Sequence, residues 1–224
     1  MKTKHASLLG VALCSAALLC SPAALAAPTI ATSRACYVQQ VIAKGVTIEV
    51  TGSGFTPGEL VFAQIPAPGG LLDFVEATVS AQGTISATLP NVIPTGIEPT
   101  IEHERMQIKG VLSGAILAEA PFELTNLGVA MHPSVARPDR KVAYRFAGFT
   151  PGQPIYGHYL HHGHVALTHR FGRAEGPCGT LSARARFFPG RSSFSTYDVQ
   201  FDDSKGFRAG SAPKVTTKLT IFHF

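Results

Sequence analysis

Tryptophan is absent from this chain of 224 residues, which excludes the Cys…Trp…Cys core of antibody-type domains. The chain also lacks any long segment in which apolar residues recur at a helical period, so we expect essentially no helix beyond residue 26. Only one long apolar run occurs, at residues 8–19, and no second run is long enough for a membrane span. What the chain has instead is 22 glycines and 16 prolines, which favour turns between short strands.

Motifs of the common enzyme classes are missing as well. There is no Gly-x-Ser-x-Gly, no phosphate-binding loop, no His-Glu-x-x-His and no Cys-x-x-Cys. Asp202 and Asp203 are adjacent, but neighbours on a strand point to opposite faces and cannot act on one substrate together. Ser192-Ser193 with nearby histidines is a combination that arises by chance in a chain with nine histidines. We therefore expect a non-enzymatic protein without a cofactor.

The first 26 residues have the pattern of a secretory signal peptide. Lys2 and Lys4 precede the apolar run, and Ala24-Leu25-Ala26 fits the cleavage rule. An uncleaved anchor is disfavoured because the run is short of the roughly 20 residues that a span needs. Lipidation at Cys14 or Cys20 is disfavoured because leucine precedes each cysteine. The sequence predicts an exported, extracellular protein whose mature chain starts at Ala27.

A repeat divides the mature chain. Residues 54–58, Gly-Phe-Thr-Pro-Gly, recur as residues 148–152, 94 positions later. This period has the size of a seven-stranded sandwich and is too long for a solenoid unit. The sequence predicts an all-β protein with a signal peptide at 1–26 and two tandem immunoglobulin-like β-sandwich domains, at 27–125 and 126–224.

Strands are predicted from apolar residues that alternate with polar ones. Val46, Ile48 and Val50 share one face of such a segment. Thr-Pro-Gly then supplies a type II turn, in which glycine takes the positive φ of the third position. The predicted strands are 29–33, 46–55, 59–65, 72–79, 83–89, 104–112 and 115–124 in the first domain, and 127–131, 142–149, 154–161, 164–171, 181–188, 195–202 and 214–223 in the second.

Several segments resemble a known group of proteins. Cys36-Tyr37 followed by the segment 46–58 is similar to secreted tandem immunoglobulin-like β-sandwich repeat proteins of high-GC Gram-positive bacteria. The segments 154–159, 171–181 and 199–202 of the second half are similar to the same group. The resemblance implies the fold, and it implies no catalytic residue, because the role of the group is mostly unknown.

Two cysteines, Cys36 and Cys178, remain after signal removal, and export permits a disulfide. If each strand crosses its domain, successive loops fall at alternate ends. Counting strands then places Cys36, in the loop after the first strand, and Cys178, after the fourth strand of the second domain, at the domain junction. We predict an interdomain disulfide, and the alternative is two separate thiols.

Charge is distributed unequally between the two halves. Residues 28–125 hold four Lys/Arg against nine Asp/Glu, whereas residues 126–224 hold thirteen against five. The same strand counting gathers the tip loops 132–141, 161–164 and 189–194 at the far end of the second domain. These loops carry cations and histidines, namely His132, Arg137, Arg140, Lys141, His161, His162, His164 and Arg191. The ligand-binding candidates are Arg137, Arg140, Lys141 and Arg191, for an anionic partner; the alternative is that the charges only solvate the surface.

Histidines form the one group with metal-site potential. His158, His161, His162 and His164 lie near one hairpin, with His169 beyond it, and imidazole is a common ligand of zinc and copper. Their spacing matches no defined motif. His158 and His164 could be cross-strand neighbours, whereas His161 and His162 point to opposite faces.

These patterns favour a secreted structural or adhesive binding module. Its expected partner is an anionic cell-envelope polymer or another surface protein, with no specific nucleic acid. The alternatives are an extracellular metal-binding protein that uses the histidine hairpin, a hydrolase, and a spacer without a ligand.

Overall fold

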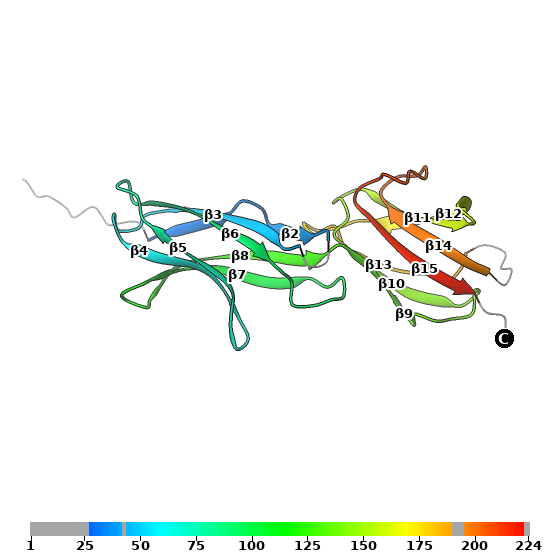
Figure 1. The fold of residues 1–224 in the computed structure, drawn as a ribbon, viewed down its shortest axis with the longest axis horizontal. Coiled ribbons are helices and arrows are strands. Elements are labelled where there is room, and N and C mark those ends of the chain that lie inside the picture. The colour runs from blue at the N-terminus through cyan, green and yellow to red at the C-terminus, as the bar shows by residue number, and fades with distance from the viewer. Residues whose placement is uncertain (1–26, 42–43, 190–194, 222–224) are drawn as a thin grey trace, which may run out of the picture.

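Two β-sandwiches lie end to end in the computed structural model (Figure 1). The structure describes residues 27–41, 44–189 and 195–221, and the regular elements in these ranges are all strands. The expected all-β architecture of two tandem immunoglobulin-like sandwiches is thus confirmed. The expected signal peptide at residues 1–26 lies outside the described residues and stays a prediction.

In its described residues, the N-terminal sandwich contains eight strands in two sheets. One sheet has the order β1-β3-β6 and the other β2-β8-β7-β4-β5. The strands are β1 (Thr29–Thr32), β2 (Cys36–Gln39), β3 (Val46–Ser53), β4 (Leu60–Ala67), β5 (Gly70–Thr78), β6 (Thr84–Val92), β7 (Glu102–Gly110) and β8 (Ile116–Asn126).

The C-terminal sandwich contains seven strands. One sheet has the order β13-β10-β9 and the other β12-β11-β14-β15. Its first, second and fifth strands share one sheet, and its third, sixth and seventh share the other, as in immunoglobulin-like sandwiches. The strands are β9 (Gly128–His132), β10 (Lys141–Ala147), β11 (Pro154–His161), β12 (His164–Arg173), β13 (Leu181–Arg186), β14 (Ser195–Asp202) and β15 (Lys214–Ile221).

Each sandwich buries its own core between its two sheets. The first core includes Ile48, Val50 and Leu89, and the second includes Tyr144, Phe146 and Phe201. β3 alternates buried and exposed residues as its sequence predicts, because successive side chains of a strand point to opposite faces. The first core lies on one side of residue 125 and the second on the other, but the division into 27–125 and 126–224 stays a prediction.

The repeated pentapeptide forms the same corner in both sandwiches. The amide of Glu59 donates to Thr56 O, and the amide of Gln153 donates to Thr150 O, each at 3.1 Å, which closes a turn around Pro-Gly. The glycines of these turns, Gly58 and Gly152, have φ of 78° and 77°, as a type II turn requires.

One strand lies where a loop was expected. β2 pairs in parallel with β8, and Cys36 stands beside Glu123 in that register. The strand has four residues, and its partner is more than eighty positions away, so local alternation gives no signal for it. β2 brings the segment after β1 across to the second sheet, next to the junction between the sandwiches.

Candidate functional site

A disulfide joins the two sandwiches. Cys36 and Cys178 are bonded, with their Cα atoms 5.3 Å apart, and they are separated by 142 positions in sequence. The predicted interdomain bridge is confirmed, although Cys36 opens strand β2 and does not lie in a loop. Successive loops fall at alternate ends of each sandwich, as the strand counting assumed. Hydrogen-bonded neighbouring strands accordingly run antiparallel, and the one exception among the described strands is the parallel pair β2 and β8.

Cys178 is held by the corner of the C-terminal sandwich. The amide of Gly148 donates to Cys178 O at 2.9 Å, and the amide of Phe149 donates to Gly179 O at 3.3 Å. Gly179 has φ of 57°, and a Cβ there would collide with the carbonyl oxygen of Phe149. The repeated pentapeptide therefore positions the loop that carries the second cysteine of the bridge.

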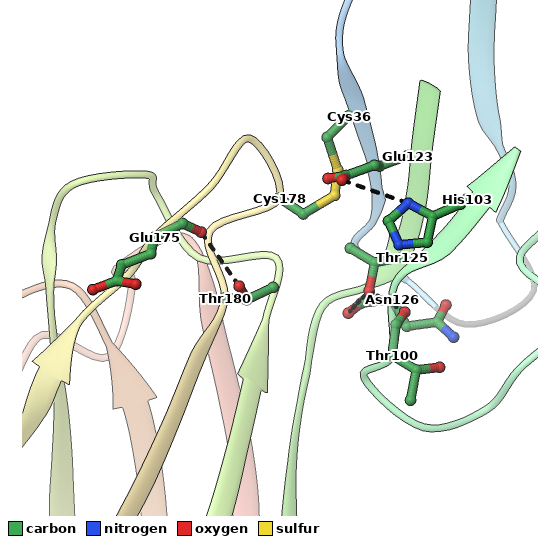
Figure 2. Close-up of a disulfide and its surroundings, with 9 residues drawn as sticks. All are labelled: Cys36, Thr100, His103, Glu123, Thr125, Asn126, Glu175, Cys178 and Thr180. Atoms are coloured by element: carbon green, nitrogen blue, oxygen red, sulfur yellow. Dashed lines mark hydrogen bonds and ion pairs between the residues drawn. A yellow bond between two sulfur atoms is a disulfide. The ribbon is translucent and has the colours of Figure 1, made fainter. Parts of the chain in front are cut away.

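Glu123 lies beside the bridge, as Figure 2 shows. Its Oε1 is 3.7 Å from Nδ1 of His103, and its Oε2 is buried with no hydrogen-bond partner. A cavity of about 350 Å³ adjoins this group, and residues of both sandwiches line it, including Ala35 and Pro177, which precede the two cysteines. The junction thus has a carboxylate, a disulfide and an open volume in one place.

Other contacts fix the junction. The amide of Leu127 donates to Gln39 O at 2.8 Å. Within the N-terminal sandwich, next to the junction, the hydroxyl of Thr125 donates to Thr100 O at 2.7 Å, and both residues are drawn in Figure 2. At Gly148 a Cβ would come within 2.7 Å of Val38 Cγ1, so glycine permits this close approach. Covalent, hydrogen-bonding and packing contacts together hold the two sandwiches in one relation.

Four exposed cations occupy the outer face of β10 and β13. We call Lys141, Arg145, Arg184 and Arg186 the basic face. Alternate residues of a strand share a side, and the exposed residues of both strands are the ones opposite the buried core. Lys141 pairs in register with Arg186, whereas Arg145 and Arg184 stand opposite Ser182 and Ala143. Because Ser182 and Ala143 are small, the guanidinium groups of Arg145 and Arg184 are open to solvent.

The charges of the basic face are not balanced by neighbouring carboxylates. Within the described part of the chain, none of the four cations lies within 4.0 Å of a carboxylate oxygen. Along a strand, residues two apart are separated by about 6.6–6.8 Å. The basic face therefore presents a row of positive charges that a linear polyanion could follow.

The predicted ligand-binding cations are placed differently from one another. Lys141 belongs to the basic face, and Arg140 is exposed just before it, in the loop that follows β9. Arg137 lies in the same loop, with Nε 3.8 Å from Asp139 Oδ1, so a carboxylate partly offsets its charge. Arg191 lies outside the described residues. His132, expected at the tip, has Nε2 4.0 Å from Glu98 Oε2 of the N-terminal sandwich.

Arg145, Arg184 and Arg186 were not predicted as functional residues, because the prediction considered the cations of the loops and not those of the strands. A signal was present, since polar positions of β10 and β13 alternate with apolar ones and these polar positions are mostly cationic. Reading the charge of each strand face, not only its apolar side, would have found them.

The histidines of the hairpin occupy two places: His161, His162 and His164 lie together at the turn, whereas His158 lies apart from them. His158 stands opposite Thr168, and His164 stands opposite His161, so the expected pairing of His158 with His164 is wrong. The turn at His162 and Gly163 sets His161 opposite His164, and an extra residue of β12, Ala166, then shifts the register by one, so that His158 meets Thr168. The rings of His161 and His162 have centroids 4.1 Å apart, so the expectation that they point to opposite faces is wrong, because His162 leaves the strand with a φ of 49° in the turn. His161 also packs against Tyr197. A metal site at His158, His161, His162 and His164 stays a prediction.

His158 instead belongs to a buried polar network. His158 and Asp202 are both fully buried, and His158 Nε2 is 3.3 Å from Asp202 Oδ1. Gln200 Nε2 donates to Asp202 Oδ2 at 2.6 Å, and the hydroxyl of Ser211 donates to the same oxygen at 2.7 Å. The amide of Ser204 donates to Asp202 Oδ1 at 2.8 Å. The network thus ties the segment after β14 to the outer face of its sheet.

His169, the last histidine of the group, is half-buried. Its ring contacts Phe171 edge-to-face with centroids 4.8 Å apart. Burial lowers the pKa of His169 because the charged imidazolium loses hydration there.

Among the described residues, no helix has the length and apolar character needed to cross a membrane. No protein-family model matches the chain, and no curated protein sequence matches it either.

Solved structures show weak similarity to the chain. The human OSCAR ligand-binding domain is 16% identical with a TM-score of 0.33, and the alignment covers 87% of this chain and 97% of that one. A tetra-tandem repeat from the extending region of a large adhesion protein is 12% identical with a TM-score of 0.30, covering 87% and 48%. The BSP domain of a biofilm-associated protein is 12% identical with a TM-score of 0.30, covering 86% and 30%.

Proposed function

We propose that this protein is an exported, non-enzymatic binding module whose basic face holds a linear anionic polymer of the cell envelope. The observation that carries the proposal is the basic face itself, with four exposed cations and no carboxylate within ion-pair distance in the described ranges. Arginine suits this role because its guanidinium group donates two parallel hydrogen bonds to a phosphate or carboxylate. The exposed Arg140 extends the positive surface toward the tip.

The arrangement of the two sandwiches supports presentation of this face. The disulfide and the hydrogen bond from Leu127 to Gln39 keep the C-terminal sandwich at the end of the N-terminal one. The N-terminal half carries an excess of acidic residues, which disfavours polyanion contact there and directs it to the basic face.

Binding of the full chain to labelled inorganic polyphosphate and to polygalacturonate tests the proposal. We expect binding to both, weakened strongly at 0.5 M salt because exposed charges are screened over a few ångströms there. The double variant Arg184→Gln/Arg186→Gln should bind about 30-fold more weakly, since each cation near an anionic surface contributes about 1 kcal/mol.

The matched control is Lys205→Gln/Lys218→Gln, which removes the same charge from exposed positions outside the basic face. Equal weakening in the two double variants would show that net charge alone attracts the polymer and would refute a defined face. Binding that is unchanged at 0.5 M salt would also refute it.

A further inference from the structure

Glu123 stands beside the oxidised bridge with one of its two carboxylate oxygens, Oε2, buried and unpaired. In Figure 2 its carboxylate lies against the two sulfur atoms, and no donor reaches its buried Oε2. A buried carboxylate oxygen without a hydrogen-bond partner loses hydration. Oε1 of the same carboxylate lies 3.7 Å from Nδ1 of His103, whereas the disulfide offers Oε2 neither a proton nor a positive charge. A cation at this point would give Oε2 a partner.

The sulfur atoms of Cys36 and Cys178 and a carboxylate oxygen of Glu123 lie within 4.8 Å of one another. In the described ranges this is the one group of three such side chains that could hold a metal ion. Thiolate and carboxylate are zinc ligands, at about 2.3 Å and 2.0–2.2 Å respectively, which places the ligand atoms of a tetrahedral site about 3.4–3.8 Å apart. Once the S–S bond is broken, rotation about the Cα–Cβ bonds of the two cysteines can move the sulfurs apart toward that spacing.

We propose that Cys36, Cys178 and Glu123 bind Zn²⁺ when the disulfide is reduced. A dithiol reductant transfers two electrons and two protons to the bridge, so the S–S bond becomes two thiols and the reductant becomes a disulfide. Both thiols then lose their protons to solvent as they bind the metal, which stays divalent. The two sandwiches are thus joined by a covalent bond in one redox state and by a metal ion in the other.

Access to the site is provided by the adjoining cavity of about 350 Å³. Glu123 lines it, as do Ala35 and Pro177, each of which directly precedes one of the cysteines, so the cavity reaches the carboxylate of the site. Cys178 itself is buried. In the proposed site the metal and the water that completes its coordination approach from this volume beside Glu123.

Cobalt(II) is the probe that tests the proposal, because it replaces zinc and gives a thiolate-to-metal absorption band. The full chain, reduced with a phosphine and kept anaerobic, should bind one equivalent of Co²⁺ with that band, and Zn²⁺ should displace it. The oxidised chain and the variant Cys36→Ser/Cys178→Ser should show no such band. The variant Glu123→Gln should bind Co²⁺ at least about tenfold more weakly.

Glu119→Gln is the matched control, since Glu119 lies on the same face of β8 and pairs with Arg105. It should bind Co²⁺ like the unaltered chain. The proposal is overturned by a reduced chain that gives no thiolate band, or by Glu123→Gln with unaltered affinity. Circular dichroism of the reduced chain with Zn²⁺ provides a second criterion, because a chain unfolded under that condition also overturns it.

Discussion

Lys141 and Arg186 face each other directly across β10 and β13, and both are exposed. Like charges in this position repel, and no carboxylate within the described residues offsets them. This repulsion destabilises the sandwich locally, and a pair of opposite charges at these two positions would remove it. Such a cost is typical of a surface kept for a ligand of opposite charge.

Arg186→Glu should convert the repulsive pair into an ion pair with Lys141. We expect a gain in the free energy of unfolding of about 0.2–1 kcal/mol, because opposite charges attract in directly opposed positions. Affinity for polyphosphate should fall in the same variant. Urea denaturation followed by circular dichroism measures the first effect, and Arg186→Gln, which only removes the repulsion, should be intermediate. A variant Arg186→Glu less stable than Arg186→Gln would contradict the pairing.

Much of the fold could be predicted because its signals are local. The alternation in Val46–Ser53 marks a strand within eight residues, and the Thr-Pro-Gly turn follows from the φ that proline and glycine favour. The parallel strand β2 could not be predicted, because its partner β8 lies far along the chain and only tertiary packing specifies that pairing.

The site was less accessible to sequence reasoning. Strand counting brought Cys36 and Cys178 together, since it needs only the order of elements. It did not give the pairing of His158 with Thr168, because the extra residue Ala166 in β12 shifts the register by one residue, and no pattern in the sequence indicates this bulge. Burial of Asp202 was also unforeseen, since charged residues are rarely buried without partners and its partners come from a loop.

Asp202→Ala should destabilise the C-terminal sandwich by about 1–3 kcal/mol, because it removes the buried acceptor that His158, Gln200 and Ser211 share, although Ser204 O and Arg208 O remain near these groups. Chemical denaturation measures the loss. Asp198→Ala is the matched control, since Asp198 lies on the same strand but is exposed. Equal effects in the two variants would argue against the network as a source of stability.

Cys36→Ser/Cys178→Ser should uncouple the unfolding of the two sandwiches. Closing a loop of this length stabilises a single cooperative chain by about 5 kcal/mol in the chain-entropy model. Each sandwich has a core of its own, so the constraint acts between two units that can unfold separately. We expect calorimetry to show two transitions, the first at a lower temperature than in the oxidised chain. Thermograms that match in the two proteins would contradict a coupling role of the bridge.

Asp203→Asn should stabilise the chain at neutral pH. Burial raises the pKa of Asp203, and Asp202 raises it further, although hydrogen bonds from Thr150 act in the opposite direction. An acid with a raised pKa in the folded state favours folding when protonated, and that contribution is lost as the pH rises through the raised pKa. The gain in melting temperature should therefore be present at pH 7 and vanish below the ordinary value of 3.8. A gain that does not depend on pH would contradict the role of ionisation.

Gly179→Ala should destabilise the C-terminal sandwich more than Gly176→Ala does. Both glycines have positive φ, which costs other residues about 1–2 kcal/mol. A Cβ at Gly176 meets nothing within 4 Å, whereas at Gly179 it collides with Phe149 O, so we expect a further loss of about 1 kcal/mol or more there.

Gly83, whose Cβ would lie 2.7 Å from Phe55 O, occupies the corresponding place in the first repeat. Gly83→Ala should therefore destabilise the N-terminal sandwich, and hydrogen exchange resolved by residue distinguishes the two. If each substitution loosened both sandwiches equally, the two repeats would not be independent corners.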